Sequence, residues 1–170
     1  MKEQDEKLLE RLEAFFENLG LSYKKDTIGE KPALILTYDP EDDQLPGDCT
    51  ITICHPGEDF TAIQMLISIF VELDEKTTAD AASLLPVMNS ALSIGHFGVI
   101  RDEGYFYYNY SFLTNGMSDE GVLISAAAAL SIISDTAAEG IDILLPLING
   151  EKDVDEIRNE DILWRTNIRR

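Results

Sequence analysis

Two histidines are the side chains in this sequence best suited to acid–base chemistry, because imidazole titrates near neutral pH. His96 begins the segment HFGVIRDEGYFYYNY, and His55 follows a cysteine. A catalytic histidine needs a nucleophile or a substrate within hydrogen-bonding distance, and usually an orienting group. No nucleophile elbow, cysteine–histidine signature or paired-carboxylate motif accompanies either one. We therefore expect that the protein is not an enzyme. The alternative hypothesis is a small-molecule-binding or hydrolytic enzyme that uses His96 or His55.

A metal site is the next chemistry to consider, because Cys49, Cys54 and His55 lie close together in the sequence. Positions five apart on a strand point to opposite faces, and so do neighbours, so these three side chains cannot converge on one ion without a bulge. Their spacing also differs from the usual zinc patterns. The acidic loop DPEDDQLPGD at residues 39–48 lacks the order of calcium ligands in an EF-hand. We expect no metal and no cofactor.

The tyrosine-rich segment could stack nucleic-acid bases, but the charge of the chain opposes this. The 32 acidic residues outnumber the 13 lysines and arginines, and the net charge is −19. Such a surface repels phosphate backbones and anionic lipid. The apolar stretch from Gly121 is interrupted by Asp135, Glu139 and Asp142, which argues against a membrane span. No signal peptide is visible, so the sequence predicts a cytoplasmic protein. The charge and the interrupted apolar stretch predict that it has no nucleic-acid or membrane partner.

The pattern of apolar residues predicts the elements that carry these side chains. Residues 5–19 have helical spacing, with Asp5 as a cap and Gly20 after the end. Strands are expected from residues 21, 33, 49 and 62, followed by a helix with Thr77 or Thr78 as its cap. Pro86 either kinks this helix or belongs to the first turn of a regular part that begins near residue 85. Residues 96–101 and 105–113 form a hairpin, and a long helix follows Ser118.

This order predicts an α+β fold, in which helices cover one face of an antiparallel sheet. The predicted order is helix, three or four strands, helix, two strands, helix. Residues 1–150 are expected to form a single domain, and residues 151–170 a C-terminal appendage.

The segment VMNSALSIGHFGVIRDEGYFYYNYSFL, followed by SDEGVLISAAAAL, resembles the YbjN family, which has the type III secretion chaperone-like fold. The shared features are Asn89 in the helix, the turn before Gly95-His96-Phe97, an acidic turn ending in glycine, and the aromatic strand. The resemblance extends in coarse order over residues 5–150. It implies a fold that is usually dimeric, binds polypeptide segments or acts as a regulatory adaptor, and needs no cofactor.

We therefore expect a non-enzymatic, chaperone-like or adaptor module that binds a polypeptide and forms a homodimer. The strand from residue 62 and the aromatic hairpin both carry apolar side chains on two faces, and three helices cannot obviously cover both. The candidate interaction surface consists of Leu66, Phe70, Tyr105, Tyr107 and Trp164. A second candidate for the dimer contact is the small-residue stretch 126–129.

Overall fold

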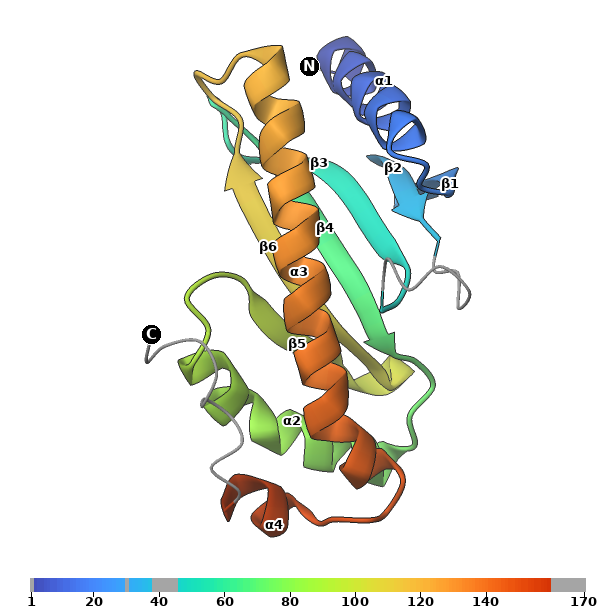
Figure 1. The fold of residues 1–170 in the computed structure, drawn as a ribbon, viewed down its shortest axis with the longest axis vertical. Coiled ribbons are helices and arrows are strands. Elements are labelled where there is room, and N and C mark those ends of the chain that lie inside the picture. The colour runs from blue at the N-terminus through green and yellow to red at the C-terminus, as the bar shows by residue number, and fades with distance from the viewer. Residues whose placement is uncertain (1, 30, 38–45, 160–170) are drawn as a thin grey trace. The chain divides into compact units, whose positions relative to one another are not determined.

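The computed structural model describes residues 2–29, 31–37 and 46–159, and it confirms the α+β class and the predicted order (Figure 1). The elements are α1 (Lys2–Asn18), β1 (Tyr23–Ile28), β2 (Lys31–Leu36), β3 (Cys49–Gly57), β4 (Phe60–Phe70), α2 (Glu75–Ser90), β5 (His96–Ile100), a 3-10 turn η1 (Arg101–Glu103), β6 (Tyr105–Leu113), α3 (Asp119–Ile148) and α4 (Val154–Asn159). Four strands therefore precede α2, at the upper end of the expected number.

The strands form one sheet in the order β1-β2-β3-β4-β6-β5. Every pair with a described register is antiparallel. Two backbone hydrogen bonds show the same direction for β4 and β6, because Thr114 N donates to Thr61 O and Leu73 N donates to Gly104 O. The sheet therefore ends in two edge strands, β1 and β5.

The chain folds into two compact units. The first comprises Met1–Ile67 and Tyr110–Ser134, and the second comprises Ser68–Asn109 and Asp135–Arg170. Each unit has its own buried core.

The core of the first unit forms where the alternating side chains of β3 and β4 meet two helices. Ile51, Ile63 and Met65 are fully buried on one face of these strands. Phe16 of α1 and Ile133 of α3 are also fully buried. Alternate side chains of the strands thus form one side of the apolar core, and side chains at helical spacing in α1 form the other.

The core of the second unit is aromatic. Phe106 and Tyr108 of β6 are fully buried, and Phe97 of β5 is 3% exposed. The Phe97 ring lies 5.0 Å from the Tyr108 ring, measured between centroids. On α3, a β-carbon at Gly140 would lie 2.5 Å from Cε1 of Phe97, so only glycine permits this approach of helix to sheet.

Two helix starts differ from the predicted ones. Asp5 lies inside α1, which begins at Lys2, and is not its cap. Asp74, and not Thr77 or Thr78, caps α2: its carboxylate accepts from the Thr77 backbone N at 3.0 Å. The helix runs through Pro86, which excludes a start near residue 85. Aspartate is preferred over threonine at this position, and Asp74 lies just before the two threonines that the sequence analysis considered.

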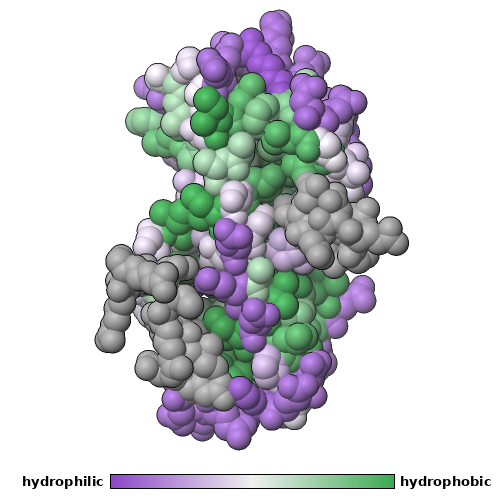
Figure 2. All heavy atoms as spheres, viewed as in Figure 1, coloured by the Kyte–Doolittle hydropathy of each residue, from purple (hydrophilic) through white to green (hydrophobic). Residues whose placement is uncertain are grey.

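The outer face of α3 is more apolar than the sequence argument assumed. An 18-residue window of this helix has a mean hydropathy of 1.6, which by length and composition alone is sufficient to cross a membrane. The acidic residues of this helix therefore do not exclude a membrane span, contrary to the expectation from the sequence. The core helix of a soluble protein passes the same test. Ile124 is 60% exposed, and Figure 2 shows patches of hydrophobic residues on the face drawn there.

Candidate interaction surface

Strand alternation divides the second unit into a buried aromatic face and an open one. The cross-strand pairs Phe97–Tyr108 and Val99–Phe106 point into the core. The pairs His96–Asn109, Gly98–Tyr107 and Ile100–Tyr105 point the other way. The hydroxyl of Ser68 lies 2.6 Å from that of Tyr105, which places Ser68 and its alternate neighbour Phe70 on the same side. We call this surface the tyrosine face: Ser68, Phe70, His96, Gly98, Ile100, Tyr105, Tyr107 and Asn109.

The tyrosines are held flat against the sheet. The Tyr107 ring covers Gly98, because a β-carbon there would lie 2.4 Å from Cζ of the tyrosine. The Tyr105 and Tyr107 rings are 5.9 Å apart, and His96 meets Tyr107 edge-on at 6.5 Å. The bond to Ser68 fixes the end of Tyr105. Glycine opposite tyrosine thus gives a preorganised aromatic surface with little rotamer freedom left to lose on binding.

This face is half-buried and not closed. Phe70, Tyr105 and Tyr107 are all partly accessible, and Ile100 is 42% exposed. The carboxamide oxygen of Asn109 is buried and has no hydrogen-bond partner among the described residues. A buried acceptor without a donor costs free energy, but this oxygen is closed to solvent, so a ligand on the surface cannot reach it in this conformation.

The charges at the end of the tyrosine face are mainly acidic. Asp102 and Glu103 follow β5 in η1 and are exposed, and Arg101 is the basic residue beside them. Glu72 follows β4 with a backbone φ of 57°, a left-handed conformation that is uncommon outside glycine. The surroundings therefore favour a cationic ligand over an anionic one.

The structure places the predicted surface residues in different parts of the chain. Phe70, Tyr105 and Tyr107 share the tyrosine face of the second unit. Leu66 belongs to the first unit, where it lies opposite Thr50 and is half-buried. Trp164 lies outside the described residues. Sequence reasoning missed Gly98, whose position opposite Tyr107 becomes evident only from the strand register.

His55 has the partners that a catalytic histidine requires, but in an unsuitable arrangement. Its Nε2 lies 3.0 Å from a carboxylate oxygen of Asp5, and its Nδ1 lies 3.5 Å from the hydroxyl of Thr61. The same Nδ1 lies closer, at 3.2 Å, to the carbonyl oxygen of Phe60. A ring nitrogen that donates to a carbonyl cannot also accept a proton from the hydroxyl. The geometry is that of a histidine joining α1 to the β3–β4 hairpin.

The cysteines lie apart, as strand geometry predicts. Cys49 is fully buried, and burial raises the pKa of its thiol to about 12. Cys54 is half-buried and lies with its sulfur 3.7 Å from the carbonyl oxygen of Ala62. Among the described residues, no group of three or more histidine, cysteine or acidic side chains could hold a metal ion. Most of the acidic loop considered for calcium lies outside those residues.

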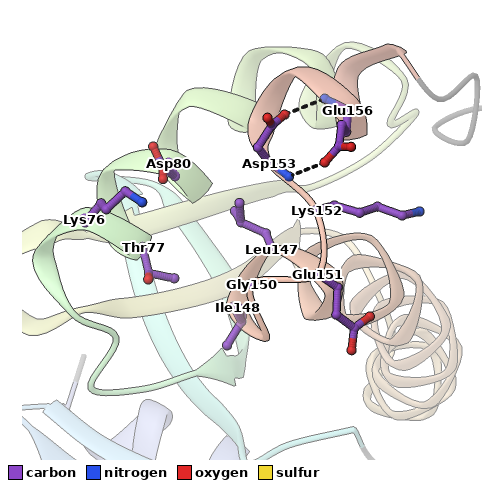
Figure 3. A pocket seen from close by; sticks show the side chains of 10 residues that line it. All are labelled: Lys76, Thr77, Asp80, Leu147, Ile148, Gly150, Glu151, Lys152, Asp153 and Glu156. Atoms are coloured by element: carbon purple, nitrogen blue, oxygen red, sulfur yellow. Dashed lines mark hydrogen bonds between the residues drawn. The ribbon is translucent and has the colours of Figure 1, made fainter.

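A cavity of about 390 Å³ lies in the second unit between α2 and the start of α4 (Figure 3). Its lining is polar and contains neither histidine. Two of its carboxylates are already engaged, because Asp153 and Glu156 each accept the other's backbone N–H at 2.8 Å and cap α4. This reciprocal cap accounts for these two carboxylates without a ligand. A second cavity, of about 190 Å³ in the first unit, also lacks a histidine.

The fold and this surface define an α+β protein with an antiparallel sheet and a preorganised aromatic face. No family model matches the sequence, and no curated protein does. Among solved structures the chain is similar to YbjN from E. coli, described as "a putative transcription regulator". That match has 16% identity and a TM-score of 0.48, and covers 75% of this chain and 86% of the other. It agrees with the resemblance found in the sequence, and it concerns the fold alone.

Proposed function

We propose that this chain is a non-enzymatic, polypeptide-binding module, chaperone-like or a regulatory adaptor, which acts in the cytoplasm as a homodimer. The observation that carries the proposal is the tyrosine face, where flat, partly accessible tyrosine rings lie beside the exposed side chain of Ile100. Tyrosine suits such a surface, because its ring packs against a partner while its hydroxyl stays hydrogen-bonded.

The partner we expect is a basic segment with apolar side chains. The chain carries a net charge of −19, and Asp102 and Glu103 border the tyrosine face. An arginine guanidinium stacks on tyrosine rings and is attracted by carboxylates, so it matches both the rings and the acidic border of the face. Phosphate-bearing ligands are disfavoured by the same charges.

Binding of displayed peptides tests the proposal. Random peptides are selected on the purified full chain, and the affinity of the selected peptide is measured by fluorescence anisotropy. The variant Ile100→Ser removes an exposed apolar side chain from the tyrosine face, and we expect it to weaken binding by about fivefold or more. Ile124→Ser makes the same change on the outer face of α3 and is the matched control. Selected peptides that bind both variants as tightly as the original chain would refute this site.

The alternative of a histidine-dependent hydrolase receives less support. His96 is exposed beside Tyr107, and no hydroxyl, thiol or carboxylate hydrogen bond to its ring is described. His55 is turned toward a carbonyl oxygen. A general base must have the proton it abstracts within reach, and within the described part of the chain only the 3.5 Å contact of His55 with Thr61 approaches this requirement.

A further inference from the structure

The outer edge of β1 is open to pairing. β1 is the first strand of the sheet, and no described residue pairs with its outer side. Its residues from Lys24 to Ile28 are exposed. An unpaired strand edge offers a row of backbone donors and acceptors to another chain. The question is which chain this edge fits.

Hydrogen-bond parity identifies the residues whose backbone faces outward. Thr37 N donates to Ser22 O, and these two residues continue the β1–β2 register. In an antiparallel pair such hydrogen-bonded positions alternate with non-bonded ones. Ser22, Lys24 and Asp26 therefore direct their backbone groups to β2, and Tyr23, Lys25 and Thr27 direct theirs outward. Consistent with this assignment, the Asp26 carboxylate accepts the Thr27 N–H at 2.7 Å, as a local cap of the open edge.

The side chains of β1 are self-complementary in one antiparallel register. When two copies of β1 pair about a two-fold axis at Lys25, Tyr23 lies opposite Thr27, and all three outward residues are used. Lys24 then faces Asp26 of the second copy, twice by symmetry, on the face away from α1. A shift by two residues in either direction would bring together two copies of Lys24 or two copies of Asp26 instead. Opposite charges at facing positions stabilise a sheet, and like charges destabilise it.

The lysine at the two-fold axis does not oppose this register. Lys25 lies on the α1 side of the sheet, where its Nζ is 2.7 Å from Oε2 of Glu13. The Tyr23 hydroxyl donates to the other oxygen of Glu13 at 2.8 Å. Each copy therefore brings its own carboxylate to neutralise Lys25. The sequence YKKDTI also has one more basic than acidic residue, so this edge is locally positive in a chain of net charge −19.

We propose that the outer edge of β1 is the dimer contact, and that it pairs antiparallel with β1 of a second copy of this chain. The two sheets join into one continuous sheet. In the dimer the carboxylate of each Asp26 releases the Thr27 N–H of its own chain and pairs with Lys24 of the second copy. Lysine on an edge strand ordinarily discourages pairing. Here both lysines have partners in the dimer. The inference rests on the homodimer of the proposed function, but it does not involve the tyrosine face.

Charge reversal tests the register. Sedimentation equilibrium of the full chain gives the dimer dissociation constant. We expect Lys24→Asp and Asp26→Lys each to raise this constant by roughly tenfold or more, because each single change creates two like-charged pairs. The double variant, which exchanges the two charges, should restore it to near the original value. A dimer that is indifferent to both single changes, or a chain that is monomeric at about 100 μM, would overturn the proposal.

Disulfide crosslinking tests the axis independently. Facing residues in a hydrogen-bonded antiparallel pair have Cα atoms about 5.5 Å apart, within the range of a disulfide. In a Cys54→Ser background, we expect Lys25→Cys to form a covalent dimer under mild oxidation, and Lys7→Cys on the exposed part of α1 to remain monomeric. Equal crosslinking of both would refute the edge contact. Unchanged peptide binding by the charge variants would show that the tyrosine face is intact, so failure of one proposal is distinguishable from failure of the other.

Discussion

Asn89 at the end of α2 closes the other edge of the sheet, and its replacement should be costly. Its side-chain nitrogen donates to the carbonyl oxygen of Phe97 at 3.0 Å, and its side-chain oxygen accepts the Phe97 N–H at 2.7 Å. Phe97 lies on the edge strand β5 and is 3% exposed. The carboxamide therefore satisfies the backbone N–H and C=O of Phe97 as a neighbouring strand would. Apart from asparagine, only glutamine has a side-chain amide with both a donor and an acceptor.

The expected magnitude follows from the two backbone groups. A buried N–H or C=O that loses its partner costs about 1–3 kcal/mol. Asn89 is half-buried, so water can reach part of the site, and we expect Asn89→Ala to lower the free energy of unfolding by about 2–4 kcal/mol. Asn89→Asp retains the acceptor but not the donor when ionised. Protonation restores an O–H donor, so this variant should regain stability relative to Asn89→Ala as the pH falls from about 7 to about 4.

Urea unfolding followed by circular dichroism at both pH values measures these differences. Ser90→Ala is the control, because the adjacent serine is exposed and bonds only within the helix, to Val87 O at 2.8 Å. That change should stay within about 0.5 kcal/mol of the original chain. If Asn89→Ala has no greater effect than Ser90→Ala, the carboxamide does not close the edge. If Asn89→Asp shows no gain relative to Asn89→Ala on acidification, the donor to the Phe97 carbonyl is not important.

Three further predictions concern single positions. Gly140→Ala should destabilise the chain by about 1–3 kcal/mol, because its β-carbon would lie 2.5 Å from the Phe97 ring. Gly121→Ala in the same helix should cost less, because the nearest atom to its β-carbon is Ser118 Oγ at 3.2 Å; thermal unfolding measures both changes. In the native chain at about pH 8, thiol reagents should label Cys54 before Cys49, because burial holds the Cys49 pKa near 12; rapid labelling of both would contradict this. Asp74→Ala should lower the melting temperature. The side-chain hydrogen bond from Thr77 lowers the pKa of Asp74, so its contribution is present above the unfolded-state pKa and is lost on acidification, and the difference between variant and original should shrink there.

The sequence predicted the parts of this fold that depend on local periodicity. The alternation along residues 105–112 placed Phe106 and Tyr108 on one face and Tyr105 and Tyr107 on the other, and both core residues are fully buried. The hairpin glycine was also correctly predicted, since Gly104 has a φ of 58°. These features depend on residues adjacent in the chain, where one face of a strand or one turn type decides the outcome.

The features that the sequence did not predict depend on pairing between distant segments. Asn89 was recognisable as part of a resemblance, but its two bonds to Phe97 require α2 to end beside the edge of β5. The approach of Gly140 to Phe97 joins residues more than forty positions apart in the sequence. His55 likewise contacts Asp5, which lies fifty residues away in the sequence. No local pattern encodes such contacts, because they depend on strand register and helix placement.

Salt should affect the two proposed interactions in opposite directions. Two chains of charge −19 repel each other over distances comparable to the Debye length, about 8 Å at physiological ionic strength. The Lys24–Asp26 pairs of the proposed dimer act at contact distance and are screened less than this long-range repulsion. Raising the salt concentration from about 0.05 M to about 0.5 M should therefore leave the dimer unchanged or strengthen it. A basic peptide on the tyrosine face is attracted by the same net charge, so its dissociation constant should rise over that range. A dimer that dissociates with salt would mean that attraction between charges, and not backbone pairing at β1, holds it together. Peptide binding that is indifferent to salt would assign its affinity to the aromatic rings alone.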